Sequence, residues 1–333
     1  MIDTNTVIQV IDAGEKRRIE RRRFLRSASQ ASIAAGGLAL LAACGGSSTP
    51  TDPGTTTGTP TPSPSSTDQL HDQDVLNFAL NLEYLEAQFY LFATTGSGLN
   101  ASLLTGVGTQ GTVVGGRAVT FTDPIVAQYA REIAADELAH VGFLRSLLGG
   151  AAVAMPNINI DGSATGAFTA AARKAGVVTS AQTFDPYASD ENFLLGAFIF
   201  EDVGVTAYKG GSILLNSLIY LDAAAGILAT EAYHAGLVRT ALYAKGLAMP
   251  SLRTQAGQIS DARDSLDGST DDDQGIIGTA TASNITPADA NGFVYTRTAG
   301  QVLNIVYLTN TATVGGGFFP NGLNGNIRTS AAS

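Results

Sequence analysis

The chain has 333 residues and a formal net charge of −10 at pH 7. Residues 1–43 hold seven basic and four acidic residues, so 12 basic and 25 acidic residues remain in the rest of the chain. That excess of acids excludes nucleic acid as a partner and argues against anionic lipid, because both bind basic surfaces.

Two export signals occur in order near the N-terminus. Arg21 and Arg22 open the run Arg-Arg-Arg-Phe-Leu-Arg, which resembles a twin-arginine export signal. The apolar stretch 28–43 that follows is too short and too rich in small residues to span a bilayer. It ends in Leu-Ala-Ala before Cys44, the single cysteine, and so resembles a bacterial lipobox. We therefore expect residues 1–44 to direct export to the cell envelope and Cys44 to carry the lipid that anchors the protein to the membrane.

Residues 45–67 are almost all Gly, Ser, Thr and Pro, a composition that favours a linker without packed structure. We expect a tether of roughly 25–70 Å between the lipid and the folded part. About 265 residues follow, enough for one large domain with its own core. Helical patterns divide them into a bundle at 68–249 and a C-terminal extension at 250–333 that packs on it.

Four segments have the apolar periodicity of long helices and residues that begin or end helices. One begins at Asp123-Pro124, an N-cap followed by proline, and another is expected to stop at Gly246. Shorter helices are expected at 166–175 and 298–308. The predicted fold is all-α, a four-helix bundle with helices at about residues 68–93, 123–150, 189–211 and 220–245.

The connections within this bundle are long. About thirty residues join the first two helices, and within them residues 113–119 favour a β-hairpin. About forty residues join the second helix to the third, enough to cross the length of the bundle.

The two helix pairs resemble each other. Residues 83–90 and 201–208 each begin with Glu and end with Tyr. Residues 137–145 and 231–239 share the frame Glu-x-x-His-x-Gly-x-x-Arg. The same order of matches in both halves predicts a duplicated helix pair related by a pseudo-twofold axis.

The repeated frame has the ligands of a metal site. Glu and His at i and i+3 lie one turn apart on one helical face, so both side chains can reach one ion. Two such helices, with one Glu from each partner helix, supply six ligands to two divalent ions; the donors suit iron or manganese and suit zinc less well. The candidate ligands are Glu83, Glu137, His140, Glu201, Glu231 and His234.

Charge leads independently to the same prediction. The four glutamates have apolar neighbours in the sequence, and four ionised carboxylates in a dry bundle are very unfavourable without compensating cations. Two divalent ions would neutralise them. Beyond residue 67 the chain has only seven glutamates and three histidines, and the frame uses four and two of them.

Other candidate residues leave alternatives open. Glu86 lies about 60° around the helix from Glu83, so it is a third ligand, a replacement for Glu83 or a solvated residue. Asp136 either holds the imidazole of His234 or is a surface residue. Tyr90 and Tyr208 either bond ligand carboxylates or pack in the core.

Two further polar features are expected to lie at the surface. His71 stands at the start of the first helix, where we expect a surface or bundle-end position. The run 271–273, three consecutive aspartates, is expected to form a solvated loop, with calcium binding as the alternative.

Four segments of the chain resemble the bacterial and fungal ferritin-like domain family, which includes the plant desiccation-related proteins. The resemblance spans about residues 70–325 and implies the ferritin-like fold, with Glu83 or Glu86 and the other five candidate residues as ligands. Unlike true ferritins, the chain has long connections and an extension of about 80 residues. The segments are residues 77–86, 201–208, 223–228 and 316–322.

Three functions remain open at this point. A manganese pair favours catalase-like disproportionation of hydrogen peroxide, and an iron pair favours ferroxidase or peroxidase chemistry on a small oxidant. The alternatives are a non-enzymatic envelope or stress protein with a structural or vestigial metal site, and a metal-buffering protein. An open coordination position would favour the enzyme, and a closed site would favour the structural protein.

Overall fold

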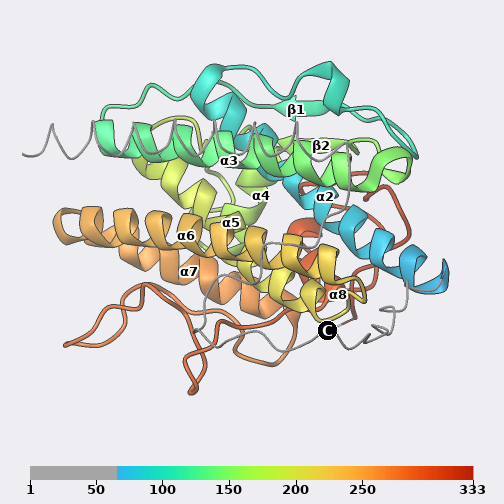
Figure 1. Ribbon diagram of the computed structural model, residues 1–333. Coiled ribbons are helices and arrows are strands. Elements are labelled where there is room, and N and C mark those ends of the chain that lie inside the picture. The colour runs from blue at the N-terminus through green and yellow to red at the C-terminus, as the bar shows by residue number, and fades with distance from the viewer. Residues whose placement is uncertain (1–65, 333) are drawn as a thin grey trace, which may run out of the picture. The chain divides into compact units, whose positions relative to one another are not determined.

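The computed structural model describes residues 66–332, which hold seven α-helices and two three-residue strands (Figure 1). The prediction of an all-α fold is confirmed. The predicted export arginines Arg21 and Arg22, the lipidation site Cys44 and residues 45–65 lie outside the described residues. The four long helices are α2 (Ser66–Thr95), α3 (Pro124–Leu148), α5 (Asp190–Ser212) and α6 (Leu218–Ala248).

The bundle consists of two helix pairs, because α2 packs chiefly against α3 and α5 against α6. The Asp123 side chain caps α3 by accepting a hydrogen bond from the backbone N–H of Ile125, and Ser189 caps α5 in the same way. Gly246 does not end α6, which continues to Ala248. A Cβ at residue 246 would lie 2.3 Å from Arg253 Cγ, so this glycine allows close packing of the next helix.

The two long connections meet along a short parallel ladder. Strand β1 (Val113–Gly115) pairs with β2 (Ile158–Ile160), so the predicted hairpin at 113–119 is wrong. Parallel strands need a crossover between them, and α3 provides it. Gly116 has a φ of +90°, and a Cβ there would lie 2.6 Å from the Phe92 ring, so this glycine lets the backbone lie against α2.

The C-terminal extension contains a long helix that the sequence patterns did not predict. Helix α7 (Pro250–Asp267) lies along α6 (Figure 1), and its buried residues Leu252, Ala256 and Ile259 follow helical spacing. The shorter helices α4 (Ala167–Lys174) and α8 (Ala299–Tyr307) agree with the predicted segments. Single 3₁₀ turns occur at Ala101–Leu103 and Gly149–Ala151.

Buried ion pairs join the extension to the bundle. Asp202 of α5 accepts hydrogen bonds from Arg239 of α6 at 2.7 Å and from Arg263 of α7 at 2.9 Å. Asp273 lies 2.7 Å from Arg263 Nε and 3.0 Å from Arg297 Nη2. Asp273 is buried, so the prediction of a solvated aspartate loop is wrong at this residue, although Asp271 is exposed.

Aromatic packing fills the middle of the bundle. The ring of Phe89 stacks on Phe193 with centroids 5.5 Å apart. Phe318, from the C-terminal tail, lies edge-on to Phe168 and Phe200 at 5.2 and 4.9 Å. The tail is therefore part of the core. Along residues 66–332, no helix combines the length and apolar character that crossing a bilayer requires.

Candidate metal centre

A cluster of acidic and imidazole side chains lies inside the bundle, and all four long helices contribute to it. Helices α2, α3, α5 and α6 each contribute the glutamate of the repeated frame, and α3 and α6 each add the histidine one turn further along. The glutamates are fully buried or nearly so. They are Glu83, Glu137, Glu201 and Glu231.

One half of the cluster surrounds His140. Its Nδ1 lies 3.1 Å from Glu83 Oε2, 3.6 Å from Glu137 Oε2 and 3.7 Å from Glu231 Oε1. One ligand atom from each of these four residues lies within 4.8 Å of all the others. Such spacing allows a single ion to reach all four residues.

The other half surrounds His234. Its Nδ1 lies 3.1 Å from Glu137 Oε1 and 3.6 Å from Glu201 Oε2. Glu201, Glu231 and His234 form a second group with ligand atoms within 4.8 Å of one another. The imidazole centroids of His140 and His234 are 6.2 Å apart. Glu137 approaches both imidazoles and Glu231 belongs to both groups, so these two carboxylates can be shared between two ions.

Two tyrosines hold the outer glutamates. The Tyr90 hydroxyl of α2 donates to Glu201 Oε1 of α5, and the Tyr208 hydroxyl of α5 donates to Glu83 Oε1 of α2. Both tyrosines are buried, so packing and hydrogen bonding act together. The crossed pattern has the pseudo-twofold symmetry of the sequence repeat. Each hydroxyl fixes one carboxylate oxygen and leaves the other directed at the histidine.

Glu86 is buried beside the cluster, outside both groups. A Cβ at Gly204 would lie 2.2 Å from Glu231 Oε2 and 3.5 Å from Glu86 Oε1, so both carboxylates lie against this glycine. Gly204 is the counterpart of Glu86 in the other helix pair. The solvated alternative for Glu86 is wrong, and Glu83 rather than Glu86 lies with His140.

Asp136 and His71 lie at the edge of this region and at the end of the bundle. Asp136 Oδ2 is 3.4 Å from His234 Nε2, and its side chain is 44% exposed. This aspartate is therefore a surface residue that also orients an imidazole. His71 is exposed, as expected from its place in the chain.

Burial dominates the protonation of the carboxyls. It raises the pKa of Glu83 to about 7 and that of Glu201 to about 8, although each neighbouring imidazole opposes the shift. Burial also raises the pKa values of Glu86 and Glu231 well above the ordinary 4.5, and the other carboxylates act in the same direction.

The histidines and Glu137 shift in the opposite sense. Burial acts to lower the pKa of each imidazole, but the carboxylates outweigh it and raise the pKa to about 11 for His140 and about 10 for His234. Burial acts to raise the pKa of Glu137, but the two imidazoles outweigh it and lower the pKa. The raised pKa values mean that the other carboxyls and both imidazoles hold protons more tightly than in water. The cluster therefore favours bound positive charge, as a cation site does.

Buried atoms of the cluster that make no hydrogen bond indicate whether metal ions fit between these side chains. Six buried oxygen or nitrogen atoms of the cluster lack a hydrogen bond, although buried polar groups rarely go without one. They belong to residues of the two groups, and their donor chemistry suits iron or manganese. The residues present therefore fit a pair of divalent ions. The atoms are both carboxylate oxygens of Glu137 and Glu231, Oε2 of Glu201 and Nδ1 of His234.

Comparison with known proteins agrees with this geometry. The family model described as a ferritin-like domain matches residues 71–244, which include all the cluster residues. The chain belongs to the ferritin-like domain family. A ferritin-like catalase, Nec2 of Nesocodon mauritianus, is 29% identical to it over 268 residues, covering 77% of this chain and 84% of the relative.

A second relative of this ferritin-like chain is the desiccation-related protein PCC13-62 of Craterostigma plantagineum. The two are 34% identical over 175 residues, which cover 52% of this chain and 53% of the relative. No solved structure matches the chain significantly.

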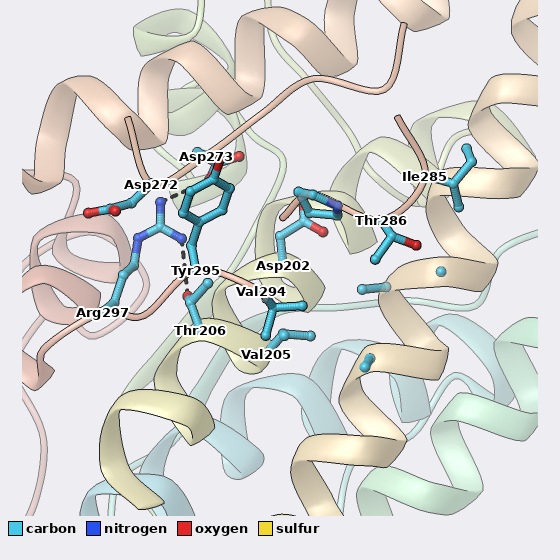
Figure 2. A pocket seen from close by; sticks show the side chains of 14 residues that line it. Asp202, Val205, Thr206, Asp272, Asp273, Ile285, Thr286, Val294, Tyr295 and Arg297 are labelled. Carbon is cyan, nitrogen blue, oxygen red and sulfur yellow. Dashed lines mark hydrogen bonds and ion pairs between the residues drawn. The ribbon is translucent and has the colours of Figure 1, made fainter. Parts of the chain in front are cut away.

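The ferritin-like domain also has a pocket away from the cluster, between α5, α6 and the extension (Figure 2). The pocket has a volume of about 60 Å³, which is enough for several water molecules. Arg297 at its wall bonds Asp273 and Thr206, as the dashed lines in Figure 2 show. The pocket shares no residue with either ligand group, so it belongs to the interface with the extension.

The arginine that closes the repeated frame has different partners in the two halves. Arg145 of α3 donates to the Tyr84 hydroxyl and the Thr105 carbonyl. Arg239 of α6 is buried and donates to the Asp202 carboxylate. Sequence reasoning assigned no role to either arginine. The signal was present in the frame itself, since the arginine recurs at the same distance from the histidine.

Proposed function

We propose that this ferritin-like protein is a di-metal oxidoreductase that acts on hydrogen peroxide or dioxygen. The observation that carries the proposal is the clustering of buried carboxylate and imidazole atoms in two groups around His140 and His234, with six of these atoms making no hydrogen bond. The centroids of the two imidazoles are 6.2 Å apart. The proposed ligands are Glu83, Glu137, His140, Glu201, Glu231 and His234. Glu86 is proposed as a further carboxylate beside Glu231.

Charge supports a pair of divalent ions. The four repeated glutamates would carry four negative charges, and two divalent ions would neutralise them without further basic residues. Iron or manganese would supply two-electron redox chemistry, which zinc, with the same donors, does not. The protein would orient the ligands through Tyr90, Tyr208 and Asp136 and exclude water from the site.

Catalase-like disproportionation is the reaction that we favour. Two molecules of hydrogen peroxide give two of water and one of dioxygen, so the reaction needs no external reductant. The name of the Nesocodon relative supports this choice. The side chain of His140 is 11% exposed, against 2% or less for the other ligands, so a small oxidant would reach the site from that side.

Export and membrane anchoring complete the proposal. Arg21 and Arg22 would direct the folded protein through a twin-arginine pathway, and Cys44 would become the acylated first residue. The supporting observation is the order of the two signals in the sequence. Replacing Cys44 by Ser is expected to release the protein from the membrane fraction and to change its mass, because the lipid is not added and residues 1–43 are not removed ahead of the cysteine. Unchanged membrane association and unchanged mass would refute the anchor.

The redox proposal is tested by oxygen evolution from hydrogen peroxide. We expect the wild type loaded with manganese or iron to evolve oxygen, and Glu231→Gln to lose that activity together with bound metal. Glu132→Gln is the matched control, because Glu132 is an exposed glutamate on α3. Equal activity in wild type and Glu231→Gln would contradict the proposal.

A structural metal site is the second candidate function. It is favoured by the closure of the cluster, in which only His140 retains appreciable exposure, and by the desiccation-related relative. This candidate predicts stabilisation by metal without turnover of peroxide. Two measurements, the melting temperature with and without metal and oxygen evolution from hydrogen peroxide, therefore separate the two functions.

A further inference from the structure

The turn between α5 and α6 and the start of α6 carry the most exposed aliphatic side chains of the described residues. Ile213, Leu218 and Ile219 are 77%, 73% and 71% exposed, and Leu214 is 44% exposed. Single apolar side chains are common on protein surfaces, but four within seven residues form a patch that mixes poorly with water. We call these four residues the α5–α6 patch.

The patch lies where the described chain begins. The backbone N–H groups of Asn216 and Ser217, inside the turn, donate to the Asp72 carboxylate at 2.9 and 2.8 Å. Asp72 is six residues from Ser66, the first residue of α2. Figure 1 shows α2 and α6 starting at the same end of the bundle. The described chain therefore begins at the same end of the bundle as the patch.

Charge indicates what this patch can bind. Residues 211–222 contain no Lys or Arg and a single acid, Asp222. The patch thus lacks the basic residues that attract anionic lipid or an acidic protein. Lys209, one turn before Ile213, donates to the Val294 carbonyl. The four aliphatic side chains fit the boundary between headgroups and acyl chains of a neutral bilayer.

An apolar groove starts beside the patch and continues inward. Ser212 and Leu215 line its outer part, and Leu82 and Tyr208 line its inner part. The Tyr208 hydroxyl donates to Glu83 of the cluster. The apolar character of this end therefore extends from the surface to the wall of the candidate metal centre.

We propose that the α5–α6 patch inserts into the interface of a lipid bilayer, so that the tethered domain stands on the end where α2 and α6 begin. The inference rests on the lipid anchor at Cys44 proposed above. A tether of 21 residues, 45–65, between Cys44 and Ser66 keeps the patch at a high effective concentration near the membrane, so weak insertion suffices. Four residues are few for a stable dimer, which usually buries about 800 Å² on each partner.

The test uses two features of the sequence, a single cysteine and no tryptophan. The full, unacylated chain is coupled through Cys44 to phosphatidylcholine vesicles that contain a maleimide lipid. Ile219→Trp supplies one fluorophore in the patch, and Leu247→Trp supplies the control, since Leu247 is exposed at the opposite end of α6. We expect coupling to shift the emission of Ile219→Trp to shorter wavelength and brominated lipid to quench it, with Leu247→Trp unchanged.

The outcomes separate lipid from other occupants. Adding Ile213→Gln and Leu218→Gln to the Ile219→Trp chain should abolish the shift, because the patch then loses two of its aliphatic side chains. Both side chains are exposed, so their replacement spares the core. An unchanged Ile219→Trp emission on vesicles would overturn the inference. So would a shift that depends on protein concentration without vesicles, which would assign the patch to a second copy. Because the coupling is chemical, failure of acylation in cells would leave this result intact and refute only the anchor.

Discussion

Gly204 occupies in the second helix pair the position that Glu86 occupies in the first. A Cβ there would lie 2.2 Å from Glu231 Oε2, so Gly204→Ala must displace a carboxylate that both ligand groups share. We expect metal affinity to fall about 10–100-fold, as for other changes that reorient a ligand. Gly226→Ala is the matched control, because nothing lies within 4 Å of a Cβ at that exposed position of α6. Equal affinities in competition titrations would contradict the assignment of Glu231 as a ligand.

Glu231 and Glu137 make opposite contributions to the metal-free protein. The raised pKa of Glu231, caused by burial and by the neighbouring carboxylates, means that the fold disfavours its charge, so Glu231→Gln should stabilise the metal-free chain at pH 7. Glu137 has a lowered pKa because two imidazoles surround it, so Glu137→Gln should destabilise by about 1–3 kcal/mol. Urea unfolding in the presence of chelator measures both changes. If both variants lost the same amount of unfolding free energy, the cluster would be an ordinary ion-pair network instead.

The residues brought together by the fold were largely predictable, and their neighbours were not. The repeated spacing of Glu and His is enough to place six residues on inward faces, because helical geometry fixes which positions share a face. The position of Glu86 depends on how α2 is rotated about its axis within the bundle, which the sequence does not give. Gly204 has no side chain, so the Glu86 carboxylate can lie against it. The burial of Asp273 depended on arginines distant in sequence, which periodicity does not reveal.

At the scale of elements, the four long helices followed from boundary residues, whereas the connections did not. The predicted hairpin failed because the partner of β1 is β2, more than forty residues away, and local sequence carries no information about such a pairing. Helix α7 was not predicted because its apolar positions, such as Leu252, Ala256 and Ile259, are few among polar residues. Pro250 at its first position was the available signal.

The junction between α5, α6, α7 and the following loop is predicted to be essential for stability. Asp273 is buried between two arginines, and its pKa is lowered because their charges outweigh the effect of burial. Asp273→Asn should cost about 3–5 kcal/mol in the free energy of unfolding, because it removes the carboxylate that two buried guanidinium groups share and leaves them only Asp202 and Asp267. Asp271→Asn, at an exposed neighbour, should change it by less than about 0.5 kcal/mol. Equal values for the two variants in urea titrations would contradict this role.

For the whole molecule, stability should depend on pH differently with and without metal. The pKa values of Glu83 and Glu201 are raised from 4.5 to about 7 and about 8. Their stabilising protonation is complete below about pH 4.5 and is lost as the pH rises through 7 and 8. The raised pKa values of His140 and His234 act in the same direction up to about pH 10–11. The melting temperature of the metal-free protein should therefore fall from pH 6 to pH 9.

Metal should weaken or reverse that trend, because ions bind deprotonated ligands more tightly as the pH rises. Thermal melts at several pH values, with chelator and with manganese or iron, provide the comparison. Parallel curves with and without metal would indicate that the cluster titrates as an ordinary buried network. Glu132→Gln, outside the cluster, should reproduce the wild-type curves in both conditions.

The metal content of the protein purified from cells supplied with iron and manganese tests the central claim most directly. The account predicts about two redox-active ions per chain in the wild type and a clear loss in Glu231→Gln, since both groups use that carboxylate. Elemental analysis by mass spectrometry gives both values on folded protein. A folded, unaggregated wild type that contains no metal and takes up none on incubation with either ion would contradict the account.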